Sequence, residues 1–255
     1  MNAIALTLFT PAVPPVESVS EPTASSVINQ NYERVNVSQL AAFDTGVMTR
    51  FQDHLRSIPF TFANVNPTAM GRRLHSEADV RTFLDSSIVV PCWPVCLAMV
   101  HEDRHTDIVL RCESAMDQGG VKIRPDANIE EYHPQPEMRN TLLICEYKRP
   151  GAMQSFRLVA NACENNRPID PPTAWDTITE QLRKYAVETG CRTVFCSDGC
   201  DGAVFMFPRD TSDGSSPIRY CFATSDPQPP SGKLTMRQAF VFAVYVSLGI
   251  TRKLR

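Results

Sequence analysis

Asp126, Glu146 and Lys148, near the middle of the 255-residue chain, have the types and spacing needed for phosphoryl chemistry. Glu146 and Lys148 follow an apolar run and are separated by one residue, so on a strand they share one face. Two neighbouring carboxylates repel each other unless a cation or a proton neutralises them, and oxygen ligands favour Mg²⁺ or Mn²⁺. Such a metal activates water for attack on a phosphodiester, and a lysine stabilises the charge that develops.

Two strands joined as a hairpin are needed to bring Asp126 beside Glu146. The segments 121–129 and 141–148 have the composition of strands, with Asp126 inside the first and Glu146 and Lys148 at the end of the second. The polar segment 132–140 between them, which contains two prolines, is typical of a loop. A third strand is predicted over 106–112.

These residues belong to a wider resemblance, which covers about residues 76–207. This segment resembles the restriction-endonuclease-like, PD-(D/E)XK nuclease superfamily. It is similar to the nuclease-like domains found in many fungal proteins and to the amino-terminal nuclease domain of type I restriction motor subunits. The matching pieces are Arg124-Pro125-Asp126, the ExK strand 144–150, the helical segment 181–186 with its Gln181, and the turn Ser197-Asp198-Gly199.

The resemblance implies an α/β fold with a restriction-endonuclease-like core, a mixed central sheet flanked by helices. It implies that Asp126 and Glu146 bind the metal and that Lys148 is the catalytic lysine. It makes Glu77, on the helix before the core strands, an additional candidate ligand, and Gln181 a residue that orients substrate or water. The twenty positions from Asp126 to Glu146 require an insertion between the two strands.

Structural roles compete with these assignments. Asp126 could be a turn residue, and Lys148 a charge that protects an edge strand from aggregation. Glu77 could only stabilise the first turn of its helix, and Gln181 could be an ordinary surface residue. Tyr185, one turn after Gln181, is interpreted as core packing rather than as a base-stacking residue.

The remaining pattern predicts one domain over 35–255, preceded by a disordered or loosely attached segment, 1–34. Apolar residues at helical spacing from Leu40 to Leu55 predict a first helix. A second helix opens at Ser76 and is expected to break or end at Pro91 or Pro94. The further predicted elements are a helix over 174–189, strands over 193–197, 203–207 and 218–223, and a closing helix over 235–248.

Composition limits the classes of function. The formal net charge of −3 shows no global basic signature, which argues against tight non-specific coating of DNA. Nine scattered cysteines and the lack of a recognisable secretory signal favour an intracellular protein, in the nucleus or cytoplasm, with reduced thiols. The apolar run 239–250 is too short to span a bilayer, so no membrane association is expected. A set of basic residues either lines a groove for a phosphate backbone or is scattered on the surface: Lys122, Arg124, Lys148, Arg149, Arg157, Arg183 and Lys184.

Taken together, the sequence favours a Mg²⁺- or Mn²⁺-dependent phosphodiesterase, an endo- or exonuclease, with nucleic acid, and first of all DNA, as its partner. One alternative is a catalytically inactive nuclease-fold module that binds nucleic acid or protein. A third is an RNA endonuclease with a site like that of cap-snatching enzymes, for which an essential His75, His101 or His105 would argue. The oligomeric state is not predicted.

Overall fold

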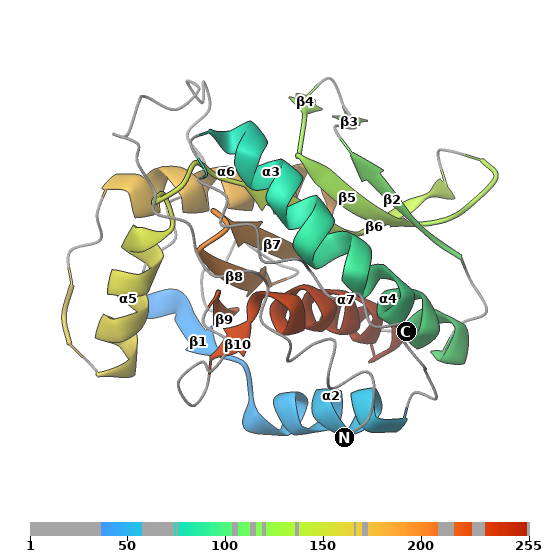
Figure 1. Cartoon of the computed structure of the whole chain (residues 1–255), viewed down its shortest axis with the longest axis horizontal. Coiled ribbons are helices and arrows are strands. Elements are labelled where there is room, and N and C mark those ends of the chain that lie inside the picture. Colours follow the sequence, from blue (N-terminus) through green and yellow to red (C-terminus); the bar gives the residue numbers. More distant parts are fainter. Residues whose placement is uncertain are drawn as a thin grey trace.

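Within the part of the chain that the computed structural model describes, eight strands form a mixed central sheet (Figure 1). Seven of them follow the order β1-β9-β8-β7-β6-β5-β2, and β10 pairs with β9 beside this path. In that order they are Leu40–Ala42, Ile218–Thr224, Asp201–Met206, Thr193–Ser197, Asn140–Tyr147, Ala127–Glu131 and Ile108–Cys112, with β10 at Leu234–Thr235. The described residues are 37–57, 74, 76–103, 107–112, 116–118, 121–135, 138–165, 167–169, 173–208, 217–225 and 233–253. The segment 1–34 lies outside them.

The pairing of the central strands determines where the candidate residues meet. β6 pairs parallel with β7 and antiparallel with β5. The carboxyl ends of β6 and β7 therefore lie at the same edge of the sheet as the start of β5. This edge carries Asp126 just before β5, and Glu146 and Lys148 at the end of β6.

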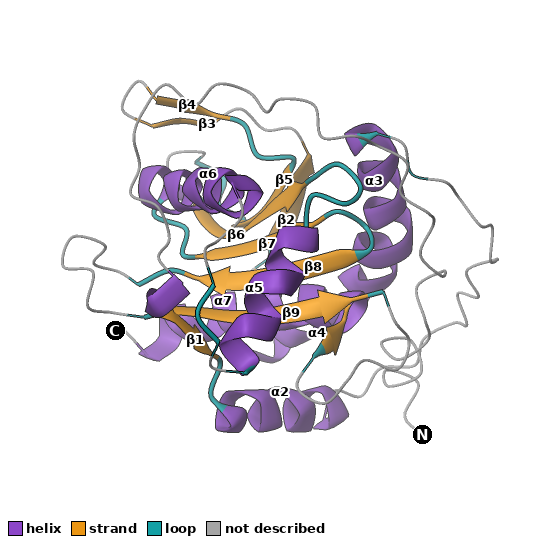
Figure 2. Cartoon of the chain, turned by 90° about the vertical axis from the view of Figure 1, so that its left-hand side faces the viewer, coloured by secondary structure: helices purple, strands orange, loops and turns teal. Residues whose placement is uncertain are grey.

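Helices cover both faces of the sheet (Figure 2). On one face lie α5 (Gln154–Glu164) and α6 (Thr173–Thr189), which connect β6 to β7. On the other lie α3 (Glu77–Leu84), α4 (Val90–Asp103) and α7 (Met236–Lys253), with α2 (Thr45–Ser57) packed against α7. Aromatic rings lie in both layers, with ring centroids 4.6 Å apart for Phe156 and Trp175 and 5.2 Å apart for Phe51 and Phe242. The general prediction of an α/β fold with a mixed central sheet flanked by helices is confirmed.

The prediction that Pro91 or Pro94 ends the second helix is wrong. A single π-helical turn, Asp85–Val89, joins α3 to α4, and the Val90 N–H bonds to the Asp85 carbonyl. Pro91 directly follows the π-helical turn, so its missing N–H falls where the regular i→i−4 ladder is already interrupted. Pro94 lies inside the helix, which continues because its neighbours are buried. The stretch Glu77–Val100 is long and apolar enough to cross a membrane, but 56% of its apolar window is buried in this fold, as in a core helix.

Other boundaries also differ from the predictions. Leu40 belongs to β1, and the first helix starts only after Asp44, whose side chain accepts a 2.6 Å hydrogen bond from the Gly46 N–H. The predicted strand 121–129 is two strands, β4 (Val121–Ile123) and β5, and β4 forms a separate hairpin with β3 (Met116–Gln118). Asp126 is therefore not inside a strand. Helix α5 was not predicted, whereas the observed α6 and β7 match their predictions closely.

Candidate active site

Asp126 lies at the sheet edge because of the register between β5 and β6. Ala127 pairs with Cys145, so one further step along the ladder places Asp126 opposite Glu146. The Asp126 Oδ2 accepts a hydrogen bond of 2.7 Å from the backbone N–H of Tyr147. This bond places the Asp126 carboxylate at the end of β6, near enough to Glu146 for its charge to act on that side chain.

Glu146, Lys148 and Gln181 form a closed set of contacts on the α6 face of the sheet. The Lys148 Nζ lies 2.6 Å from the Glu146 Oε1 and donates a second bond of 2.6 Å to the Gln181 Oε1. The Gln181 Nε2 donates to the Glu146 Oε1 at 2.8 Å and to the Tyr185 hydroxyl at 2.7 Å. Gln181 is therefore no ordinary surface residue, and Tyr185 has a polar contact in addition to its packing.

Tyr147 points to the opposite face, as alternation along the strand predicts. Its ring is fully buried among residues of α3, α4 and α7. Its hydroxyl donates a 3.2 Å hydrogen bond to the Asp85 Oδ1 at the end of α3. One residue thus connects Asp126, through its amide, to the helix on the far face of the sheet.

Burial dominates the electrostatics of the two carboxylates. Glu146 is 4% exposed, and burial raises its pKa from 4.5 to about 7, although the nearby Lys148 opposes the rise. Burial also raises the pKa of Asp126, while the Tyr147 amide opposes the rise and the charge of Glu77 adds to it. For Lys148, burial lowers the pKa, but the charge and hydrogen bond of Glu146 together with smaller contributions such as the charge of Glu77 outweigh burial, so the net shift is upward. A cation that replaced protons at this site would offset the cost of burying the two carboxylates.

Helix α3 brings further charges to the same edge. Glu77 is exposed at its first turn, and its charge acts on both Asp126 and Glu146. Arg81, one turn later, lowers the pKa of Asp126. Glu77 therefore acts on the two carboxylates through its charge, and its side chain is the most exposed of the three candidate acids.

The residues fit a divalent cation by charge and by donor type. Glu146 Oε2 is a buried carboxylate oxygen with no hydrogen-bond partner among the described residues. The charges of Glu77 and Lys148 act on both Asp126 and Glu146, and the charge of Arg81 acts on Asp126, so with all five groups ionised three negative charges are set against two positive ones. The described residues contain no group of three or more His, Cys, Asp and Glu side chains placed to hold a metal. Mg²⁺ needs only one or two carboxylates because it retains several waters, so Asp126 and Glu146 would suffice to hold it.

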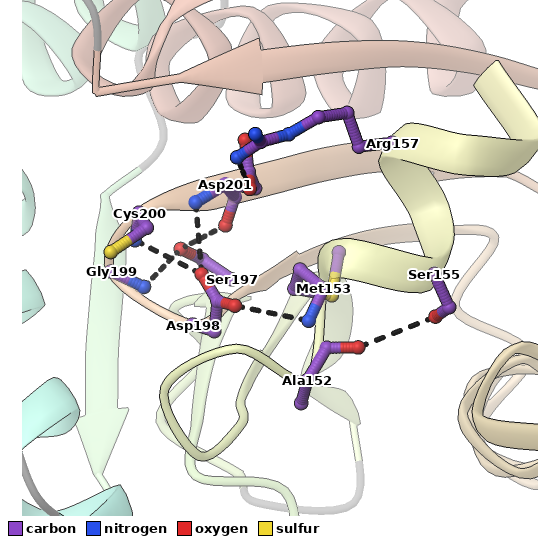
Figure 3. Close-up of polar contacts among 9 residues, drawn as sticks. All are labelled: Ala152, Met153, Ser155, Arg157, Ser197, Asp198, Gly199, Cys200 and Asp201. Atoms are coloured by element: carbon purple, nitrogen blue, oxygen red, sulfur yellow. Dashed lines mark hydrogen bonds and ion pairs between the residues drawn. The ribbon is translucent and has the colours of Figure 1, made fainter. Parts of the chain in front are cut away.

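A buried aspartate in the β7–β8 turn holds the segment that follows β6 in place (Figure 3). Asp198, 1% exposed, accepts hydrogen bonds from the amides of Cys200 at 3.0 Å and Asp201 at 2.8 Å, and a third from Met153 at 3.0 Å. Burial raises the pKa of Asp198, and these amide donors oppose the rise. The bonds connect the β7–β8 turn to the start of α5, and so fix the chain that leaves β6 after Lys148.

Two of the basic residues that were candidates for lining a phosphate-binding groove are either buried or already paired with an acidic residue. Arg183 is 5% exposed, and Arg157 forms an ion pair with Asp201. Arg81, Asp85 and Asp198 were not predicted as contributors to the site. Of these, Asp198 had a sequence signal, because it lies in the turn Ser197-Asp198-Gly199 on which part of the expected resemblance was based. The structure does not test the three histidines that would favour an RNA endonuclease. His75 and His105 lie outside the described residues, and the side chain of His101 is not described.

Comparisons with known proteins add no relatives. No protein-family model matches the chain, and no curated protein matches it.

Proposed function

We propose that this protein is a PD-(D/E)XK-type nuclease, a divalent-cation-dependent phosphodiesterase that acts on DNA. The observation that carries the proposal is the contact of Glu146 with Lys148 and Gln181 at one sheet edge, with Asp126 held by the next amide. A buried oxygen of Glu146 has no hydrogen-bond partner among the described residues. Buried carboxylates and a buried lysine are costly, and stability alone is better served by apolar residues. Such a cluster at a sheet edge is therefore a candidate for catalysis.

The protein's own residues divide the work as follows. Asp126 and Glu146 would hold Mg²⁺ or Mn²⁺, which supplies an activated water and polarises the phosphate. Lys148 holds a positive charge beside the reacting phosphate, because its raised pKa keeps it protonated. Gln181 keeps Lys148 and Glu146 in a fixed relation through its amide, and Tyr185 fixes the orientation of that amide. Glu77 is the candidate for a third acidic contact.

The test is cleavage of single-stranded DNA, duplex DNA and RNA by the purified chain in Mg²⁺, Mn²⁺ or EDTA. Two variants accompany it, Glu146→Ala and Lys148→Ala. Arg56→Ala is the matched control, because it removes one exposed charge from α2. We expect metal-dependent cutting of DNA that both site variants lose and the control retains. Metal-dependent cutting that survives Glu146→Ala contradicts the proposal.

The two alternatives give different results in the same experiment. Cutting of RNA but not DNA, lost on substitution of His75, His101 or His105, identifies the RNA endonuclease. A folded protein that cuts no substrate and binds no Mn²⁺ in calorimetry identifies a binding module.

A further inference from the structure

We propose that Arg81 binds a backbone phosphate of the nucleic acid next to the scissile bond, and that Asp85 and Tyr147 hold it there. This inference rests on the proposed function. It assigns a substrate-binding residue on the face of the sheet opposite Gln181, so that the substrate would be contacted from α3 as well as from the strands.

The position of Arg81 follows from the helix and its irregularity. Glu77, Arg81 and Asp85 follow one another at intervals of one helical turn, so they lie on one face of α3. Asp85 is also the first residue of the π-helical turn. Such turns change which residues a helix directs to one side and occur frequently at functional sites. Here the 77–81–85 face is directed to the end of β6, while α4 continues into the core.

A chain of contacts connects Arg81 to the metal ligand candidate. The Arg81 Nε lies 3.8 Å from the Asp85 Oδ2, and the Asp85 Oδ1 accepts the Tyr147 hydroxyl at 3.2 Å. The amide of the same tyrosine donates to Asp126 at 2.7 Å. The charge of Arg81 is therefore held near Asp126, and it lowers the pKa of that carboxylate.

Charge and chemistry point to phosphate as the group that Arg81 meets. Lys148 already contacts Glu146 and Gln181, so a second positive charge is needed for an acidic site to bind an anionic substrate. Arg81 is the sole Lys or Arg between residues 74 and 103, and its side chain is 25% exposed at the site edge. A guanidinium has five donors in a planar fork, so it can contact Asp85 and a phosphate together.

The experiment measures, by fluorescence anisotropy, how tightly the protein binds a fluorescein-labelled DNA oligonucleotide, either single-stranded or duplex. Binding is measured in Ca²⁺, and a gel verifies that the strands remain uncut. Arg81→Ala is compared with Arg81→Gln, which keeps a donor for Asp85 but loses the charge. Arg56→Ala is the matched control, because α2 lies on the other side of the molecule from α3 (Figure 1). We expect both Arg81 variants to bind roughly tenfold more weakly. We also expect the slope of log affinity against log salt to fall by about one.

Further outcomes separate this inference from the proposed function. Arg56→Ala should bind DNA within about twofold of the wild type and with an unchanged salt slope. Calorimetry should show that the Arg81 variants bind Mn²⁺ at least as tightly as the wild type, because a positive charge near Asp126 has been removed. If the wild type binds DNA and both Arg81 variants bind it equally well, the inference is wrong and the nuclease proposal stands. Loss of Mn²⁺ affinity in those variants also overturns it, because Arg81 would then act on Asp126 alone. If the wild type binds no DNA, both proposals fail.

Discussion

Replacing Glu146 by glutamine should stabilise the protein while removing its metal site. Burial raises the pKa of Glu146 from 4.5 to about 7, so the folded chain holds this proton more tightly than the unfolded chain does. The folded wild type therefore loses stability as pH rises from 4.5 to about 7, and the loss is complete above that range. Glutamine has no proton to lose there and keeps an acceptor oxygen for Lys148 and Gln181.

The size of the effect follows from the pKa difference. At about 1.4 kcal/mol per pKa unit, ionisation of Glu146 costs about 3 to 4 kcal/mol of folding free energy above pH 7. Lys148 stays protonated across this range because its own pKa is raised, so its attraction for Glu146 is already contained in this figure. We expect the stability of Glu146→Gln to equal that of the wild type near pH 4.5 and to exceed it by up to about 4 kcal/mol at pH 8.

Urea unfolding in EDTA at pH 4.5 and pH 8 measures this difference, with Arg56→Ala as the control. Adding Mn²⁺ at a hundred times its Kd should then stabilise the wild type by about 2.7 kcal/mol and leave the variant unchanged. If Glu146→Gln is less stable than the wild type at pH 8 without metal, the reasoning from burial is refuted. Equal stabilisation of both proteins by Mn²⁺ would refute the assignment of Glu146 as a ligand.

Three further substitutions test the surroundings of the site. Tyr185→Phe removes the hydroxyl that orients the Gln181 amide, and we expect a clear fall in kcat with a change in stability of about 1 kcal/mol, measured by cleavage rates and thermal unfolding. Asp198→Asn leaves one acceptor where three amides donate, so urea unfolding should show a loss of about 1–3 kcal/mol at neutral pH. Gly199→Ala should cost roughly 1–3 kcal/mol in the same assay, because its φ is +87° and the added Cβ would lie 2.8 Å from Leu74. Wild-type behaviour in any of these variants would contradict the role given to that residue.

The sequence predicted the elements whose local pattern and packing agree. Helix α6 has one apolar face and ends at Gly190, and β7 is a short apolar run, so both were placed well. The approach of Asp126 to Glu146 was also predictable, because it needs only a hairpin between adjacent strands. The division of 121–129 into two strands was missed, although Pro125, which has no N–H to donate to a sheet, stands at the break between Ile123 and Ala127.

The features that sequence did not reveal depend on contacts between distant segments. Helix α4 continues through Pro94 because the burial of its neighbours outweighs the local cost of a proline in a helix. Helix propensity read from the sequence does not include this energy of tertiary packing. The place of Arg81 depends on a π-helical turn and on a tyrosine hydroxyl more than sixty positions away, neither of which has a sequence pattern. The contacts of Gln181 with Lys148 and Glu146 could not be predicted from the sequence, because they depend on the packing of α6 against the end of β6.

The central claim is that Asp126 and Glu146 hold a divalent cation, and calorimetric titration of Mn²⁺ into the full chain tests it most directly. We predict one ion per chain in the wild type, no measurable binding in Asp126→Asn or Glu146→Gln, and binding at least as tight as wild type in Lys148→Ala, which loses a competing cation. Absence of binding in the wild type, or binding that both carboxylate variants retain, would contradict the account.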